Sequence, residues 1–306
     1  MTKAAARQRR QRETLIRQQR SWLVVVGIIL VILTVGRWFL TSRGTSSNAS
    51  PISQLSARDF HALAFSPTQP DTIYFGHHSG LMVSRDGGRT WQPASLQNAD
   101  AMALAAPPSN PQVVYAAGHD VLVKSTDGGA NWHPLTTNLP GTDIHGFTVD
   151  PQNAEHVYAH VAGFGIWGSQ DGGANWALLS ATAPESTFNL IVGQDINTLY
   201  AAAGEAGLFK SADGGKTWSR LSGAPGGGAM AIAYDPVTAR LYVTTLGNGA
   251  GLDVSSDNGA TWSALNLTGT LLAVAVSPQD SKHLLVVDDA GRVYSSKDGG
   301  VTWPDK

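Results

Sequence analysis

Histidine and acidic side chains recur at matching places in this sequence, and they are the groups that bind transition metals or change charge near neutral pH. Two Gly-containing turns contain the set His77, His78, His119 and Asp120. His61 and His145 each stand at the start of an apolar alternating run. These residues can form a metal site or a pH-sensitive site. They can equally be ordinary polar loop residues, because the chain has no motif with metal-ligand spacing.

Acidic residues in equivalent turns raise a second kind of chemistry, the cleavage of glycosides between two carboxyl groups that face each other across a cleft. No pair among them is brought together by spacing, so we assign no catalytic residue. Phe164 and Trp167 are candidate contact aromatics, although Trp167 can also belong to the core. The whole predicted ligand- or partner-binding face comprises His61, His77, His78, His119, Asp120, His145, Phe164, Glu205, Asn248, Asp288 and Asp289.

An eight-residue pattern, Ser-x-Asp-x-Gly-x-Thr/Asn-Trp, occurs six times along the chain. The turns that carry the candidate residues lie between its copies, so the pattern defines the framework that positions them. Its Asp residues are 41, 44, 42, 44 and 41 positions apart. A regular period of this length indicates a repeat architecture. The Asp and Trp of the six copies are Asp86 and Trp91, Asp127 and Trp132, Asp171 and Trp176, Asp213 and Trp218, Asp257 and Trp262, and Asp298 and Trp303.

The octet is interpreted as a structural turn rather than a metal site. Its Asp can accept hydrogen bonds from backbone N–H groups of its own turn, and its Gly allows the chain to reverse. Its Trp is a large apolar side chain that can fill the space between neighbouring sheets. One carboxylate per loop is far short of the six to eight oxygens that Ca²⁺ takes.

Each repeat reads as four short strands. The first repeat begins with the apolar run 61–67 (HALAFSP), continues with 72–76 (TIYFG), and reaches its octet through a third apolar run at 81–84. The Trp of the octet then opens a fourth strand. Four strands in about 40 residues is the period of a propeller blade. The sequence therefore predicts an all-β, six-bladed β-propeller with four-stranded antiparallel blades, in which residues 51–57 supply the strand missing from the last blade.

Composition excludes several classes of protein. The chain has no Cys, which rules out disulfides, thiolate metal sites and a Cys nucleophile. Residues 44–306 contain 12 Lys and Arg against 22 Asp and Glu, a net charge of −10. An acidic domain of this kind disfavours a nucleic-acid partner.

The N-terminal region predicts a membrane anchor. Residues 1–21 form a basic tail, and residues 22–40 form an apolar run long enough to span a bilayer as a signal-anchor helix. Residues 41–50 read as a flexible linker, and residues 51–306 form the propeller. Positive charge before the apolar run predicts a single-pass plasma-membrane protein with a cytoplasmic N-terminus and an extracytoplasmic propeller. The alternative is a signal peptide cut near Ser47-Asn48-Ala49.

The six octets and the strands around them resemble the BNR/Asp-box β-propellers over residues 51–306. That family includes sialidases, xyloglucan-cleaving glycosidases, sortilin-type receptors and lumenal photosystem II assembly or stability factors. The small size and lack of added domains look most like the last group. The resemblance to sialidases stops at the fold, because the Arg-Ile-Pro motif is missing and no arginine triad can be assembled from the few Arg of the domain.

Together these features predict a membrane-anchored, non-catalytic scaffold that binds a protein partner at the outer membrane face. The alternative is a glycan-binding or glycoside-hydrolysing propeller, either sialidase-like or with two carboxylates. We expect no cofactor, no metal and no nucleic-acid partner.

Overall fold

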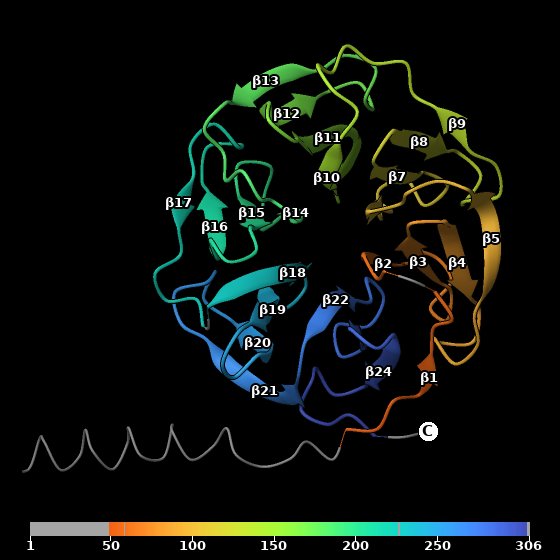
Figure 1. Cartoon of the computed structure of the whole chain (residues 1–306), viewed down its shortest axis with the longest axis vertical. Helices are drawn as coiled ribbons and strands as arrows, with labels where there is room; N and C mark the ends of the chain where they lie inside the picture. Colours follow the sequence, from red (N-terminus) through yellow and green to blue (C-terminus); the bar gives the residue numbers. More distant parts are fainter. Residues whose placement is uncertain (1–48, 58, 226, 305–306) are drawn as a thin grey trace, which may run out of the picture. The chain divides into compact units, whose positions relative to one another are not determined.

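The computed structural model describes residues 49–57, 59–225 and 227–304. Within these residues, 24 strands form six four-stranded antiparallel sheets, which surround a central axis like the blades of a propeller (Figure 1). This confirms the predicted all-β six-bladed fold. The predicted basic tail, membrane helix and nearly all of the linker lie outside the described residues. Among the residues described, no helix has the length and apolar character needed to cross a membrane.

The first three blades are formed in chain order. Blade 1 contains β2 (Ala62–Phe65), β3 (Ile73–His77), β4 (Gly80–Ser84) and β5 (Gln92–Gln97). Blade 2 contains β6 (Ala103–Ala105), β7 (Val114–Gly118), β8 (Val121–Ser125) and β9 (His133–Pro134). Blade 3 contains β10 (Ile144–Asp150), β11 (Asn153–Val161), β12 (Gly165–Ser169) and β13 (Ala177–Ser180).

The last three blades complete the ring. Blade 4 contains β14 (Asn189–Val192), β15 (Leu199–Ala202), β16 (Leu208–Ser211) and β17 (Ser219–Arg220). Blade 5 contains β18 (Gly228–Asp235), β19 (Arg240–Leu246), β20 (Gly251–Ser255) and β21 (Ser263–Thr268). Blade 6 contains β22 (Leu271–Val276), β23 (Leu284–Asp288), β24 (Arg292–Ser296) and β1 (Ser53–Gln54).

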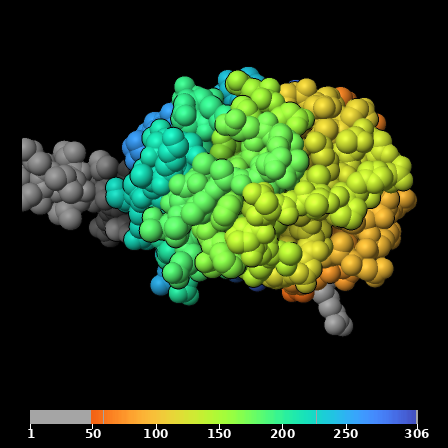
Figure 2. Space-filling model, turned by 90° about the horizontal axis from the view of Figure 1, so that it is seen from above, coloured from red at the N-terminus to blue at the C-terminus, as the bar shows by residue number. Residues whose placement is uncertain are grey.

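The core lies between neighbouring blades, because the second strand of each blade is covered on both faces. Strands β7 and β23 are buried along their whole length. A cluster between blades 2 and 3 joins Tyr115, Phe147 and Trp176. Burying apolar surface on both faces of a sheet is a main source of stability for such a fold. Seen from the edge of the ring, residues of successive parts of the chain form one continuous surface (Figure 2).

Each Asp-box turn is held by the same four hydrogen bonds, as its second copy shows. Ser125 Oγ donates to Asp127 Oδ1 at 2.7 Å and accepts from the N–H of Gly129 at 2.8 Å. The backbone N–H of Asn131 donates to Oδ1 at 2.8 Å, and its side-chain amide donates to Oδ2 at 2.7 Å. These hydrogen bonds, those from Asn131 first, lower the pKa of Asp127 to about 2. The carboxylate is therefore occupied within its own turn.

The ring closes through the two ends of the propeller. Strand β1 pairs with β24, with Ser53 opposite Val293, and the N–H of Ser50 donates to the carbonyl of Trp303. Ile52 and Leu55 are buried in the cluster between blades 6 and 1. The segment 51–57 thus supplies the outer strand of blade 6, and Trp303 packs into the cluster of blades 5 and 6 without opening a strand of its own.

Replacing the serine of one Asp box should destabilise the propeller. The Ser84→Ala change leaves the buried N–H of Gly88 and one oxygen of Asp86 without the hydroxyl that both contact. We expect the free energy of unfolding to fall by about 1–3 kcal/mol, measured by denaturant unfolding. Ser263→Ala, at the exposed first residue of β21, is the control. Equal stability of the two variants would contradict the structural role of the octet.

Shortening a buried side chain of the closing segment should also destabilise the ring. Leu55→Ala removes a side chain that is 4% exposed, and we expect a loss of about 2–5 kcal/mol in the free energy of unfolding. Val301→Ala, at a side chain that is 57% exposed, should change it by less than about 0.5 kcal/mol. If Leu55→Ala behaved like Val301→Ala, residues 51–57 would not close the ring.

Candidate functional site

One end of the ring gathers the imidazole groups singled out in the sequence. It carries the turns between the second and third strands of the blades, residues 78–79, 119–120, 162–164, 203–207, 247–250 and 289–291, together with the connections from blade to blade. We call it the histidine end; the Asp-box turns lie at the opposite end. His78 and His119 occupy equivalent turns of blades 1 and 2. His61 directly precedes β2, and His145 is the second residue of β10, so both lie at the start of an inner strand, in blades 1 and 3.

Asp100 is the centre of this arrangement. It lies in the connection between blades 1 and 2, with its Oδ1 2.8 Å from His78 Nδ1 and its Oδ2 2.6 Å from His119 Nδ1. Burial alone would raise the pKa of Asp100, but the contacts with His119 and His78 outweigh burial and lower the pKa. One carboxylate therefore touches the equivalent histidines of two blades.

A triangle of possible ligands lies on the blade 3 side of His119. His119 Nε2 is 3.2 Å from His145 Nε2 and 3.2 Å from Asp143 Oδ1. Asp143 Oδ1 is 2.8 Å from His145 Nε2. These three residues are one of two groups in the described part of the chain that could hold a metal ion.

The blade 1 side has a similar but looser arrangement. His78 Nε2 is 3.2 Å from His61 Nε2 and 3.6 Å from Asp59 Oδ2. His61, His78 and Asp100 form the second group that could hold a metal ion. Burial first, and then the neighbouring His78, lower the pKa of His61. Acids and bases thus alternate along one path of contacts, which runs Asp59–His78–Asp100–His119–Asp143.

We call these residues the His–Asp cluster: Asp59, His61, His78, Asp100, His119, Asp143 and His145. Its three acids were missed by the sequence analysis. Their signal is present in the repeat, because Asp59 and Asp143 each stand two residues before a predicted histidine, in the pattern Asp-x-His. Asp100 stands at the same place in blade 2, two residues before Met102. Period-aligned comparison of the connections between blades would have found all three.

Aromatic residues extend the site beyond the histidines. Phe188 precedes the inner strand of blade 4, and its ring stacks on His145 with centroids 6.0 Å apart. It is 36% exposed and was also missed by the sequence analysis. The predicted Phe164 is 49% exposed and lies at the same end in blade 3. Trp167 is partly buried against the core of blades 2 and 3, where its Nε1 donates to the carbonyl of Phe164.

The remaining predicted residues do not join the cluster. His77 stacks on Phe75, and Asp120 accepts a hydrogen bond from Thr142. Asp288 is buried, and its Oδ2 accepts hydrogen bonds from Arg292 and Tyr294. The exposed predicted residues of blades 4, 5 and 6 are Glu205, Asn248 and Asp289.

The four predicted acids are spread over three blades. Asp120 is in blade 2, Glu205 is in blade 4, and Asp288 and Asp289 are in blade 6, so they belong to alternate blades around the ring. Because Asp288 also binds Arg292 and Tyr294, it is committed to holding its own turn. Asp288 is therefore not free to serve as one of the two carboxyl groups that a two-carboxylate mechanism needs.

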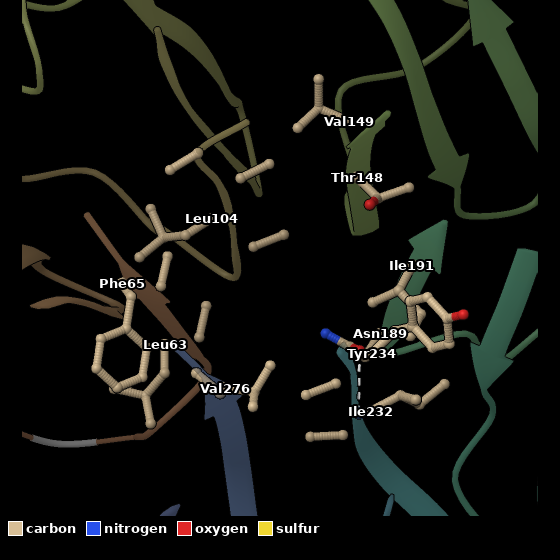
Figure 3. Close-up of a pocket in the computed structure, with 18 of the residues that line it drawn as sticks. Leu63, Phe65, Leu104, Thr148, Val149, Asn189, Ile191, Ile232, Tyr234 and Val276 are labelled. Carbon is tan, nitrogen blue, oxygen red and sulfur yellow. Dashed lines mark hydrogen bonds between the residues drawn. The ribbon is translucent and has the colours of Figure 1, made fainter. Parts of the chain in front are cut away.

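The central channel is lined mainly by apolar side chains. A cavity of about 210 Å³ follows the axis, lined by the inner strands of all six blades. Figure 3 shows Leu63, Leu104 and Ile191 among the side chains around it. The dashed line in Figure 3 marks a hydrogen bond between two inner strands, in which the N–H of Ile232 donates to Asn189 Oδ1 at 3.1 Å. His61 lies at the edge of this lining and connects the channel with the histidine end.

The family of the chain follows from the octets, the ring and a sequence comparison. The sequence model of the family described as "Photosynthesis system II assembly factor YCF48" matches residues 51–191. The octets, the ring and this match together support a BNR-type Asp-box β-propeller that resembles the photosystem II assembly factors. A comparison with curated proteins finds no match.

Solved structures share the fold of this Asp-box propeller. A GH74 xyloglucanase from Xanthomonas campestris aligns with a TM-score of 0.59 and 18% identity, covering 83% of this chain but 46% of that one. YCF48 from Cyanidioschyzon merolae aligns with a TM-score of 0.52 and 20% identity, covering 84% of this chain and 87% of that one. A structure described as "YCF48 bound to D1 peptide" gives 0.51 and 20%, covering 82% and 83%. The propeller thus spans less than half of the GH74 chain and most of each YCF48 chain.

A buried histidine beside the cluster should make the propeller sensitive to acid. Burial first, and then the neighbouring His145, lower the pKa of His160 to about 4, from 6.5 in a free side chain. Below pH 6.5 the unfolded chain takes up a proton that the folded chain refuses until about pH 4, so stability falls across that window. We expect a loss on the order of 1–2 kcal/mol between pH 7 and pH 5 from this residue.

Urea unfolding of the wild type and the His160→Gln variant at pH 7 and pH 5 measures this loss. The variant should lose less stability than the wild type over the same interval. His283, which is also buried with a pKa of about 4, is present in both proteins and cancels in the comparison. An identical pH dependence for both proteins would contradict the assignment.

Proposed function

We propose that this propeller is a non-catalytic assembly factor that binds an extracytoplasmic segment of a membrane protein at its histidine end. The observation that carries the proposal is where the family match falls. Residues 51–191, which match the assembly-factor family, include the whole His–Asp cluster and both exposed aromatics of this end, Phe164 and Phe188. The likeness to assembly factors is therefore found in the half of the ring that carries the candidate site.

The composition of the histidine end supports peptide recognition. Interfaces draw most of their binding energy from a few aromatic anchors surrounded by polar groups. Phe188 stacks on His145, and the ring of Phe164 packs over Gly141, so both aromatics are held against the surface while part of each ring stays open. Next to them, the imidazoles and carboxylates around Asp100 offer hydrogen-bond donors and acceptors.

The solved complex between YCF48 and a D1 peptide supports a peptide segment as the kind of partner. At 20% identity that structure is evidence for a shared fold only. A peptide partner for this chain is therefore part of our proposal. We further propose that residues 22–40 anchor the chain in the plasma membrane with the propeller outside. A tether of this kind would keep the histidine end at the membrane surface, where loops of integral proteins emerge.

Glycan binding or glycoside hydrolysis is the alternative, and the likeness to GH74 structures is its support. The chain corresponds to less than half of the GH74 protein, and the acids predicted here lie on alternate blades. These observations favour the binding scaffold over the hydrolase.

Site-specific crosslinking in the full-length chain tests the proposal. A photoreactive amino acid at position 164 should crosslink to an extracytoplasmic segment of a membrane protein, which mass spectrometry of the crosslinked peptide identifies. The same group at exposed position 301, at the Asp-box end, is the control. Phe188→Ala should weaken the association roughly tenfold, because it removes an aromatic anchor.

Absence of a crosslink at position 164, or an equal yield at position 301, would contradict binding at the histidine end. A panel of chromogenic glycosides and xyloglucan provides the opposing measurement on the same preparation. Turnover that disappears in Glu205→Gln would support a hydrolase function in place of the scaffold function. We expect no turnover.

A further inference from the structure

We propose that His119, Asp143 and His145 form a binding site for one divalent transition-metal ion of the Zn²⁺ type. Two imidazole nitrogens and one carboxylate oxygen are a ligand set that Zn²⁺ uses in proteins, usually with a fourth position open to an outside ligand. The three residues come from two adjacent blades, and the fold brings them together at the histidine end. The site does not depend on the identity of any protein partner.

The distances within the triangle fit an ion. Its three edges, between His119 Nε2, His145 Nε2 and Asp143 Oδ1, measure 3.2, 2.8 and 3.2 Å. A point about 2.0–2.1 Å from all three atoms, the usual Zn–N and Zn–O distance, lies about 1 Å out of their plane. This is the placement that a tetrahedral ion takes above three of its ligands, so the protein atoms need little movement to bind it.

Asp100 fixes the ring of His119 in the orientation that metal binding requires. His119 Nδ1 lies 2.6 Å from Asp100 Oδ2 and can donate its hydrogen to this carboxylate. With Nδ1 protonated, the neutral ring presents an unprotonated Nε2 to Asp143 and His145. A carboxylate that accepts the second N–H of a metal-binding imidazole is the usual support for such a ligand.

An independent observation is the state of the Asp143 carboxylate. Its Oδ1 is shielded from solvent and makes no aligned hydrogen bond, although it lies beside two imidazole nitrogens. A single proton on His145 Nε2 can satisfy only one of the contacts in the triangle, whereas a cation satisfies all three. Binding would therefore displace a proton from His145.

The surroundings favour a cation and leave room for its approach. The side chains of His119 and Asp143 are 45% and 49% exposed, so an ion could reach the triangle and keep an open position. Residues 44–306 carry a net charge of −10, which also attracts cations. The group of His61, His78 and Asp100 is less well formed, because His78 faces His61 through Nε2 but faces Asp100 through Nδ1, on the other side of its ring.

Titration of the full-length, chelator-treated chain with Zn²⁺ against a chromophoric chelator tests the site. We expect one tight ion per chain, with affinity at least tenfold lower in His145→Ala and in Asp143→Asn. Asp100→Asn should lower affinity roughly tenfold to a hundredfold through the orientation of His119. Substitution by Co²⁺ should give the intense visible absorption of a four-coordinate site.

His133→Ala is the matched control, because His133 is exposed on β9 and away from the triangle, and it should bind the ion as the wild type does. Circular dichroism and the unfolding midpoint check that each variant is folded. Full affinity in folded His145→Ala would overturn the assignment, as would wild-type binding no tighter than that of the Asp143→Asn variant. Loss of the ion in His61→Ala but not in His145→Ala would place it at the neighbouring pair and also overturn it.

Discussion

Closure of the ring is the constraint on which the rest of this structure depends. Strand β1 joins the start of the propeller to β24, and the six Asp-box turns hold their hairpins with the same hydrogen bonds. A closed ring forces equivalent positions of neighbouring blades toward each other at its inner ends. Because the Asp boxes all lie at one end, the residues at the opposite end are free to differ from blade to blade.

That freedom explains why the histidine end is specialised in only part of the ring. Blades 1 to 3 carry Asp residues at the same place before their inner strands, and blades 1 and 2 carry His78 and His119 at the same place in their turns. In the sequence these residues are far apart. In the ring they meet around Asp100, beside the exposed ring of Phe188.

The sequence was sufficient for the fold and only partly for the site. Six octets at a regular period predict blade number and strand order, because these depend on local turns and alternating apolar residues. Of the proposed site residues, His61, His78, His119 and His145 come together, whereas Asp120 and Asp288 bind within their own surroundings. Asp100 could not be recognised as the central residue from spacing alone, because its partners come from two different blades. Contacts across a blade interface depend on how the sheets pack, which the period does not specify.

The arrangement of the histidine end depends most directly on the proton that His119 shares with Asp100. Long-range ¹H–¹⁵N NMR of the imidazole rings at pH 8 identifies which nitrogen of His119 carries hydrogen. We expect hydrogen on Nδ1 in the wild type, and a shift of the ring toward the other tautomer in Asp100→Asn. Hydrogen on Nε2 in the wild type, with no change in the variant, would contradict this arrangement.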